Sequence, residues 1–204
     1  IINYQKKIFS NKVMLIEGDF LKDYVFKKIL KEISKHKKKV IVVSNLPYKT
    51  ATPILAKILK NRVFFQKLIL MFQKEQAERI VAKKNKKNYG RISVLAQWLC
   101  NIEKKMHLSP NYFFPKPKVN SLILEFKFKK KIKKVNNENL LTELIKKSFN
   151  QRRKTIKNNL KKTINFSDQI LLNCKINPNK RAQELDFSDF INLSNSFSKN
   201  MKIL

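Results

Sequence analysis

The chain has 204 residues, 43% of them apolar, which suffices for one domain with a core and a small second domain. No run of about 18 apolar residues and no signal-peptide pattern occurs, so neither a transmembrane helix nor a secretory leader is expected. Forty Lys and six Arg against 14 Asp and Glu give a formal net charge of +32, which indicates a polyanionic partner, nucleic acid first. The alternative explanation of the charge is an A/T-rich genome, which would enrich Lys and Asn without any functional demand. Attachment to a membrane surface is a weaker functional alternative than nucleic-acid binding.

The first elements predict the start of an α/β sheet. Residues 1–12 are typical of the end of a helix, and residues 12–17 of a short strand. Because the first residue is Ile, we expect that the sequence begins inside a longer protein. Asp19 follows the strand, where a carboxylate can accept hydrogen bonds from an adenine or ribose; on spacing alone, a turn-forming or helix-capping Asp is the favoured interpretation.

Residues 24–72 predict a parallel sheet with crossover helices. An amphipathic helix is expected over 24–34, and the four β-branched residues 40–43 predict a strand buried on both faces. A helix beginning at Thr52 and Pro53 and an apolar strand over 67–72 follow. The order β-α-β-α-β favours the α/β class.

The strand over 40–43 leads into Asn45, Leu46, Pro47 and Tyr48. Ligands bind beyond the carboxyl ends of the strands in open α/β sheets. The Asn45 side chain can accept a hydrogen bond from an exocyclic amine, as can the Leu46 carbonyl if Pro47 holds Leu46 extended. Tyr48 offers a flat face for a base. The alternative is a strand that ends in a Pro-containing turn.

The next stretch predicts two helices and an antiparallel pair of strands. Helices are expected over 73–81 and 89–98, the second entered through Gly90, with a basic loop over 83–87 between them. Strands are expected over 101–108 and 121–128, the second from its period of two. The loop of residues 109–119 holds three Pro and three aromatic residues and is expected to contain no helix.

A run of six Lys within residues 127–134 predicts a solvated linker between two domains, 1–129 and 130–204. The second domain is expected to be helical, with helices over 140–149, 152–160, 168–172 and 188–197, the last capped by Ser188. Arg152, Arg153, Lys154 and Lys157 would face outward. The two Cys and two His residues show no metal-ligand spacing, so no metal is expected, and Cys100 and Cys174 are expected to be reduced core residues of a cytosolic protein.

Several motifs resemble one family when taken in order. They are Asn-Leu-Pro-Tyr at 45–48, Gln-Lys-Glu at 73–75 with residues 89–95, Phe-Phe-Pro-Lys-Pro-Lys-Val-Asn-Ser at 113–121, Phe-Asn-Gln-Arg-Arg-Lys-Thr at 149–155, and residues 177–185. Together they resemble the ribosomal RNA adenine dimethyltransferases, and most closely the branch that acts on the bacterial small subunit.

The resemblance implies a fold and an activity. The fold would be a Rossmann-like, S-adenosylmethionine-dependent methyltransferase sheet, lacking its first strands here, with a small all-helical C-terminal domain. The enzyme would dimethylate N6 of two adjacent adenosines near the 3′ end of 16S ribosomal RNA during small-subunit biogenesis. Its partners would be this RNA and the pre-ribosomal small subunit, and it would act as a cytoplasmic monomer with no membrane.

The resemblance also implies roles for single residues. Tyr48 and Phe113 would sandwich the target adenine, while Asn45, Leu46 and Pro47 complete the catalytic set; a core ring is the alternative for Phe113. Asp19 and Asn45 would contact S-adenosylmethionine. The candidate RNA contacts are Lys116, Lys118, Arg152, Arg153 and Lys154, for which a solvated surface is the alternative.

The chain departs from the family in two places. Its two Gly residues, Gly18 and Gly90, form no Gly-rich cofactor loop, and Phe20 follows Asp19 where the family has a small residue that leaves room for the cofactor's adenine. We therefore expect an inactive fragment of the enzyme. The alternatives are a non-catalytic RNA-binding assembly factor, an enzyme acting on large-subunit RNA, and a DNA-binding relative of mitochondrial transcription-factor type.

Overall fold

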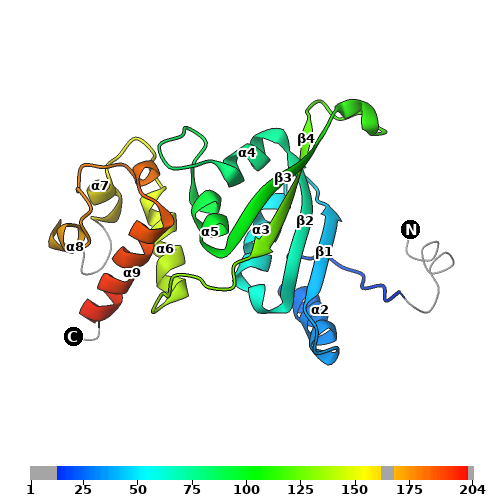
Figure 1. Ribbon diagram of the computed structural model, residues 1–204, viewed down its shortest axis with the longest axis horizontal. Coiled ribbons are helices and arrows are strands. Elements are labelled where there is room, and N and C mark those ends of the chain that lie inside the picture. Colours follow the sequence, from blue (N-terminus) through cyan, green and yellow to red (C-terminus); the bar gives the residue numbers. More distant parts are fainter. Residues whose placement is uncertain (1–12, 162–167, 202–204) are drawn as a thin grey trace.

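A four-stranded sheet with helices packed on one face dominates the computed structural model, which describes residues 13–161 and 168–201 (Figure 1). The sheet order is β1 (Val40–Asn45), β2 (Phe65–Gln73), β4 (Ser121–Phe128) and β3 (Cys100–Leu108). β1 and β2 are parallel, whereas β2–β4 and β4–β3 are antiparallel. The predicted parallel start and the antiparallel pair at the sheet edge are both confirmed.

The helices of the first half follow the predicted pattern. They are α2 (Asp23–Lys35), α3 (Ala51–Lys60), α4 (Lys74–Val81) and α5 (Arg91–Leu99), with the short turn η1 (Arg62–Phe64) before β2. One face of β2 and β4 is fully buried, because Leu70 pairs with Leu124 and Leu68 with Phe126 beneath these helices. Burial also raises the pKa of the Cys100 thiol to about 12, as suits an inert core residue, while Cys174 is half-buried.

The prediction that residues 40–43 are buried on both faces is wrong. The exposed fractions of Ile41 and Val43 are 48% and 71%, because the helices cover one face of the sheet and these two side chains lie on the other, whereas Val42 packs against the apolar core. In addition β1 pairs only with β2, and its second edge has no strand beside it in the described residues. For the same reason residues 13–17 form no strand, since a strand needs a neighbour for its peptide groups. The helix end expected over 1–12 lies outside the described residues.

The turn after residue 17 depends on Gly18. Its φ of +142° is a conformation that side-chain-bearing residues rarely adopt, and a Cβ there would lie 2.5 Å from Cγ2 of Val25. Gly18 thus lets the chain pass close over the start of α2.

The loop between β3 and β4 contains the single turn η2 (Pro110–Tyr112), so the prediction of no helix there is wrong by one turn. The Ser109 side chain caps this turn by accepting a hydrogen bond from the Asn111 N–H, and Pro stands at its first position. Proline is tolerated there because the first N–H of a helix has no partner in any case.

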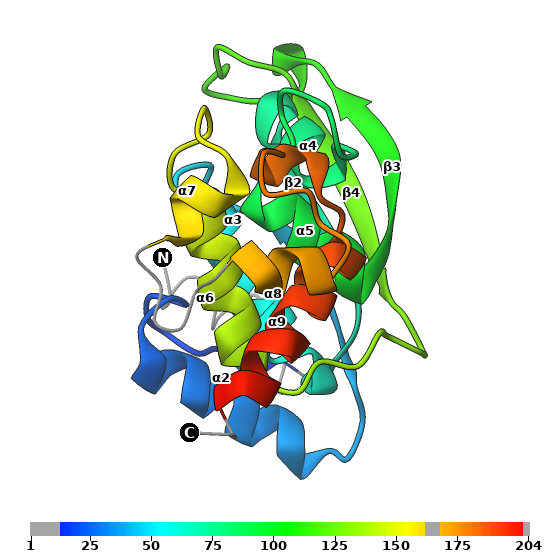
Figure 2. The same ribbon diagram turned by 90° about the vertical axis from the view of Figure 1, so that its left-hand side faces the viewer.

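The second half is helical, as predicted, and gathers beside α5 (Figure 2). Its elements are α6 (Glu138–Ser148), α7 (Ile156–Leu160), α8 (Asp168–Asn173), η3 (Ala182–Glu184) and α9 (Phe187–Met201). α7 begins only at Ile156, because the Thr155 side chain caps it. Ser188 does not cap α9; Asp186 does, accepting hydrogen bonds from the N–H groups of Ser188 and Asp189.

The lysine-rich segment 127–134 is held by specific contacts and is not merely solvated. The Lys129 N–H donates to the Leu99 carbonyl at 2.9 Å, and Trp98 Nε1 donates to the Lys133 carbonyl at 3.1 Å. One continuous apolar cluster reaches from the sheet helices into the C-terminal helices. The division of the chain at residues 129 and 130 stays a prediction.

Candidate active site

The residues at the carboxyl end of β1 line an open cleft of about 390 Å³. The structure brings Asn45, Leu46, Pro47 and Tyr48 together there with Phe113, which is 65 positions beyond Tyr48 in the sequence. Met71, Phe114, Pro115 and Pro117 complete the lining. The two rings that the sequence singled out thus share one cleft.

Hydrogen bonds on two sides hold Tyr48. Its hydroxyl oxygen lies 2.8 Å from Oγ of Ser121, a fully buried residue at the start of β4. Its carbonyl accepts a hydrogen bond of 2.8 Å from Nε2 of Gln76 on α4. The ring is half-buried, so one part of it remains available to a ligand.

The cleft combines polar groups at its opening with an apolar floor. Asn45 is exposed, while Leu46 and Met71 are 6% and 7% exposed. The Thr50 N–H donates to the Pro47 carbonyl at 3.0 Å, which closes the turn into α3. A flat ring entering the cleft would meet apolar surface below and hydrogen-bonding groups at its edge.

Two consecutive Phe residues come from the loop between β3 and β4. Phe113 is half-buried, whereas the side chain of Phe114 is completely exposed, at 102%. The sequence interpretation assigns a role to Phe113 and none to Phe114. No local pattern distinguishes Phe114 from Phe113, because which of two consecutive rings faces the cleft depends on tertiary structure.

Asp19 is not among the residues that line this cleft. Its Oδ1 accepts a hydrogen bond of 2.8 Å from the Leu21 N–H, and Phe20 packs edge-to-face on Phe26. The turn-forming interpretation of Asp19 therefore holds in the structure, while its exposed carboxylate leaves a ligand role open as a prediction.

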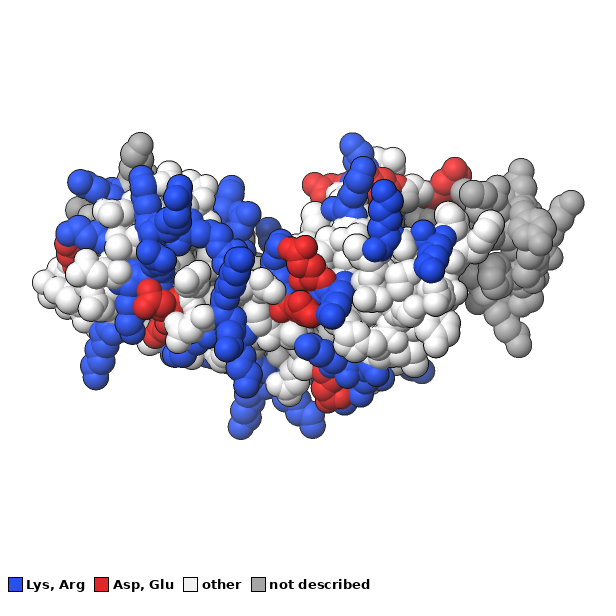
Figure 3. Space-filling model, turned by 90° about the horizontal axis from the view of Figure 1, so that it is seen from above, with Lys and Arg blue, Asp and Glu red and all other residues white. Residues whose placement is uncertain are grey.

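Lys and Arg side chains cover much of the face seen in Figure 3, in keeping with the net charge of +32. The candidate RNA contacts lie in two separate segments of this basic chain. Lys116 and Lys118 are exposed on the Pro-rich loop beside the cleft. Arg152, Arg153 and Lys154 form a turn before α7. The Arg152 guanidinium donates hydrogen bonds to the carbonyls of Lys87 and Tyr89. The turn therefore contacts the end of the lysine-rich loop 83–87.

The same loop is also joined to the segment before α9. The Asn85 N–H donates to the Gln183 carbonyl at 2.8 Å, and Lys84 pairs with Asp186 at 3.1 Å. Burial raises the pKa of Asp186, but the N–H groups of residues 188 and 189 and the Lys84 ammonium lower it more, so it stays below its usual value. Arg153 and Lys154 are exposed and have no ion-pair partner among the described residues.

Two features of the described residues bear on other kinds of site. Within 13–161 and 168–201, no helix is long and apolar enough to cross a membrane. In the same ranges, no group of three or more His, Cys, Asp or Glu side chains is placed to hold a metal ion.

Comparison with known families gives a match over nearly the whole chain. The family model described as "Ribosomal RNA adenine dimethylase" matches residues 2–199. Among curated proteins, the chain is 43% identical over 157 residues to "Ribosomal RNA small subunit methyltransferase A" of Ehrlichia canis, covering 77% of this chain and 60% of that protein. The protein of the same name from Wolbachia pipientis wMel is 38% identical over 187 residues, covering 92% and 63%.

Solved structures support the same fold. A dimethyladenosine transferase from Plasmodium falciparum superposes with a TM-score of 0.69 at 23% identity, covering 89% of this chain and 81% of that one. The 23S rRNA methyltransferase ErmE superposes with a TM-score of 0.54 at 15% identity, covering 87% and 80%. The chain spans about three fifths of the length of the curated relatives that it matches.

Proposed function

The chain belongs to the ribosomal RNA adenine dimethylase family, and we propose that it carries the target-adenosine site of an enzyme that methylates N6 of adenosines in small-subunit ribosomal RNA. The observation that carries this proposal is the cleft shared by Tyr48 and Phe113, with Asn45 and Leu46 at the carboxyl end of β1. Its relatives are named as small-subunit methyltransferases, which favours this subunit over the large one.

In the proposed mechanism the target base leaves the RNA stack and enters the cleft, since N6 is otherwise out of reach. Tyr48 and Phe113 hold the ring between them, which offsets the cost of unstacking by roughly 1–3 kcal/mol per aromatic contact. The Asn45 side chain and the Leu46 carbonyl accept hydrogen bonds from the amine. These bonds orient the nitrogen lone pair, and orientation supplies most of the rate because no proton need leave before attack.

The methyl donor would be S-adenosylmethionine, which supplies an activated methyl group on a sulfonium. The chemistry of two side chains fits this group: the exposed Asn45 amide can donate and accept, and the exposed Asp19 carboxylate can accept from an adenine amine or a ribose hydroxyl. Both side chains reach solvent, so both are accessible to a ligand.

At a finer level, the substrate would be two adjacent adenosines near the 3′ end of 16S ribosomal RNA within the pre-ribosomal small subunit, each dimethylated. The protein would act as a cytoplasmic monomer. Lys116, Lys118, Arg153 and Lys154 would contact phosphates, which their exposure and charge support.

The second candidate is an RNA-binding assembly factor without catalysis. One observation favours it: the basic turn at 152–154 and the lysine loop at 83–87 are joined by contacts that involve none of the residues lining the cleft. RNA binding through them would persist without a cofactor.

The deciding experiment is a methylation assay on small subunits that lack the modification, with radiolabelled S-adenosylmethionine. The chain as it stands and a version extended to the length of its relatives are compared, each as wild type and as Asn45→Ala. We expect the extended wild type to methylate and Asn45→Ala to lose at least about 100-fold in turnover while its RNA affinity stays within about twofold. An extended wild type that binds small subunits but never incorporates methyl groups would establish the assembly-factor alternative.

A further inference from the structure

Phe114 stands in solvent at the mouth of the cleft. It lines the cleft, yet its side chain is 102% exposed. Single exposed apolar residues are ordinary on protein surfaces. Here the same loop also exposes Tyr112, at 76%, and Val119, at 42%. Of these three exposed side chains only Phe114 lines the cleft, and an exposed ring at the edge of a cleft is a surface that a ligand can cover.

Backbone hydrogen bonds fix both ends of the loop that carries these side chains. The N–H groups of Tyr112 and Phe113 donate to the carbonyls of Ser109 and Pro110, both at 3.2 Å. At its far end, the Lys74 N–H donates to the Asn120 carbonyl at 2.9 Å. Three Pro residues in the loop, at 110, 115 and 117, fix further backbone angles. A ring presented by a stiff loop loses little conformational entropy when a ligand stacks on it.

Phe113 and Phe114 differ in exposure because the backbone between them is extended. Phe113 has φ −126° and ψ 146°, and successive side chains in extended backbone point to opposite sides. Phe113 is half-buried where the cleft closes, and Phe114 is left at its outer edge. The loop therefore offers one ring inside the cleft and one just outside it.

The charge around Phe114 selects the class of ligand. Lys116 and Lys118 are exposed on the same loop, and residues 109–120 contain no Asp or Glu. A flat apolar face on a loop that also carries two exposed cations matches an unpaired nucleobase followed by its phosphates, since bases stack on aromatic rings while Lys pairs with the backbone.

We propose that Phe114 is a stacking platform for the unpaired RNA base next to the target adenosine, with Lys116 and Lys118 on the adjoining phosphates. This inference rests on the proposed function, because it takes the neighbouring cleft to be the target site. It adds a second base subsite that holds the strand in register while Tyr48 and Phe113 hold the target.

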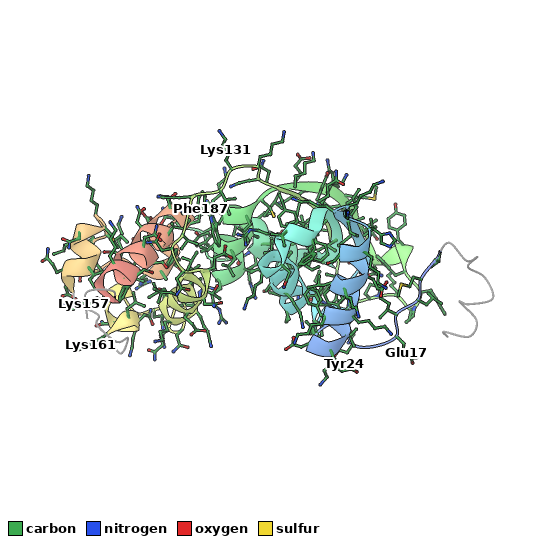
Figure 4. All side chains as sticks on the ribbon, turned by 90° about the horizontal axis from the view of Figure 1, so that it is seen from below. Glu17, Tyr24, Lys131, Lys157, Lys161 and Phe187 are labelled. Carbon is green, nitrogen blue, oxygen red and sulfur yellow. The ribbon has the colours of Figure 1, made fainter. Side chains whose placement is uncertain are left out.

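The test is a set of dissociation constants for a fluorescein-labelled RNA hairpin whose loop presents one adenosine between unpaired nucleotides. The intact hairpin is compared with three versions that carry an abasic site at the adenosine, at its 5′ neighbour or at its 3′ neighbour. The variants are Phe114→Ala, Phe114→Tyr, Tyr48→Ala and the control Tyr24→Ala. Tyr24 is 73% exposed on α2, at the opposite end of the sheet from the Pro-rich loop (Figures 1 and 4).

We expect Phe114→Ala to weaken binding of the intact hairpin about five- to 150-fold, and to have no effect on one of the two hairpins that lack a neighbouring base. Phe114→Tyr should restore wild-type affinity, and Tyr24→Ala should change nothing. The proposal is overturned if Phe114→Ala weakens all four RNAs equally, leaves all four unchanged, or couples only to the target position.

The proposed function fails separately, if Tyr48→Ala binds the intact hairpin and the target-abasic hairpin as tightly as the wild type does. Because the Phe114 side chain is fully exposed, its substitution should leave the thermal unfolding midpoint unchanged. A folding defect would therefore also contradict the exposed placement on which the proposal rests.

Discussion

The hydroxyl group of Ser121 anchors the ring of Tyr48 from the buried side of the cleft. The two oxygens lie 2.8 Å apart, and Ser121 is fully buried. The family motif contains Ser121, but the sequence interpretation gives it no role, because a serine at the start of a strand predicts nothing about a partner 73 positions away. The contact arises from the pairing of β2 with β4, which sets Ser121 opposite Gln73.

At this scale we predict energetic coupling between the two hydroxyl groups. Ser121→Ala and Tyr48→Phe should each lower the free energy of unfolding by about 1 kcal/mol, the usual net contribution of one hydrogen bond. The double variant should cost no more than either single one, because both remove the same bond. Urea denaturation of the four proteins measures this, and fully additive losses would mean that the hydroxyl groups do not interact.

Among the elements, the turn at residues 152–154 differs most from its predicted role. The sequence pattern predicts three cations on an outward helix face as equivalent phosphate contacts. In the structure no helix begins between α6 and Ile156, and the Arg152 guanidinium donates to the carbonyls of Lys87 and Tyr89. Arg152 therefore joins the turn to the loop that precedes α5, and Arg153 and Lys154 remain for RNA.

We therefore predict that Arg152→Gln and Arg153→Gln differ in their effects on amide hydrogen exchange and on RNA binding. Arg152→Gln should speed hydrogen exchange of the amides over 86–90 about fivefold, since two bonds from a charged donor at an exposed site contribute about 1 kcal/mol. Arg153→Gln should leave exchange unchanged and weaken RNA binding. Equal exchange in the two variants, measured by mass spectrometry, would show that Arg152 does not hold the loop.

The elements also show how far sequence patterns carry. Periodicity predicts the helices and strands between residues 24 and 128, because each contains enough apolar residues to mark its buried face. It fails for residues 13–17, because a strand needs a neighbouring strand, and for the burial of 40–43, because that depends on which faces of the sheet are covered. It also misplaces the cap of α9, because Asp186, two positions before Ser188, is the residue whose carboxylate reaches the free N–H groups.

Some residues of the candidate site could likewise be identified from the sequence, and others only from the structure. The motifs identify Asn45 to Tyr48 and Phe113, and these share one cleft. The supporting contacts of Gln76 and Ser121 and the exposure of Phe114 depend on tertiary geometry that no local pattern encodes. The roles of Asp19, Lys116 and Lys118 stay predictions.

For the molecule as a whole, a net charge of +32 predicts RNA binding that weakens steeply with salt. The position of the charge should still matter. Arg153→Gln with Lys154→Gln removes two charges from the basic turn, and Lys130→Gln with Lys131→Gln removes two from the linker. Lys131 and α7, which follows the turn, lie on opposite sides of the molecule (Figure 4).

We therefore predict a difference between two proteins of equal net charge. The turn variant should lower the slope of log Kd against log salt by about 1.8, because each duplex phosphate that a cation no longer neutralises accounts for about 0.9, and the linker variant should lower it by less than about 0.5. Fluorescence anisotropy from low to moderate salt measures both slopes. Identical slopes would mean that binding responds to total charge alone.

A single apolar cluster joins the sheet helices to the C-terminal helices, so the two parts of the chain should depend on each other for stability. Cleaving the chain between β4 and α6 and separating the two pieces would expose apolar surface on each. Halves that are expressed separately should therefore aggregate and not fold as independent domains. A nicked protein, by contrast, should stay assembled, because the broken covalent link is not what holds the two parts together.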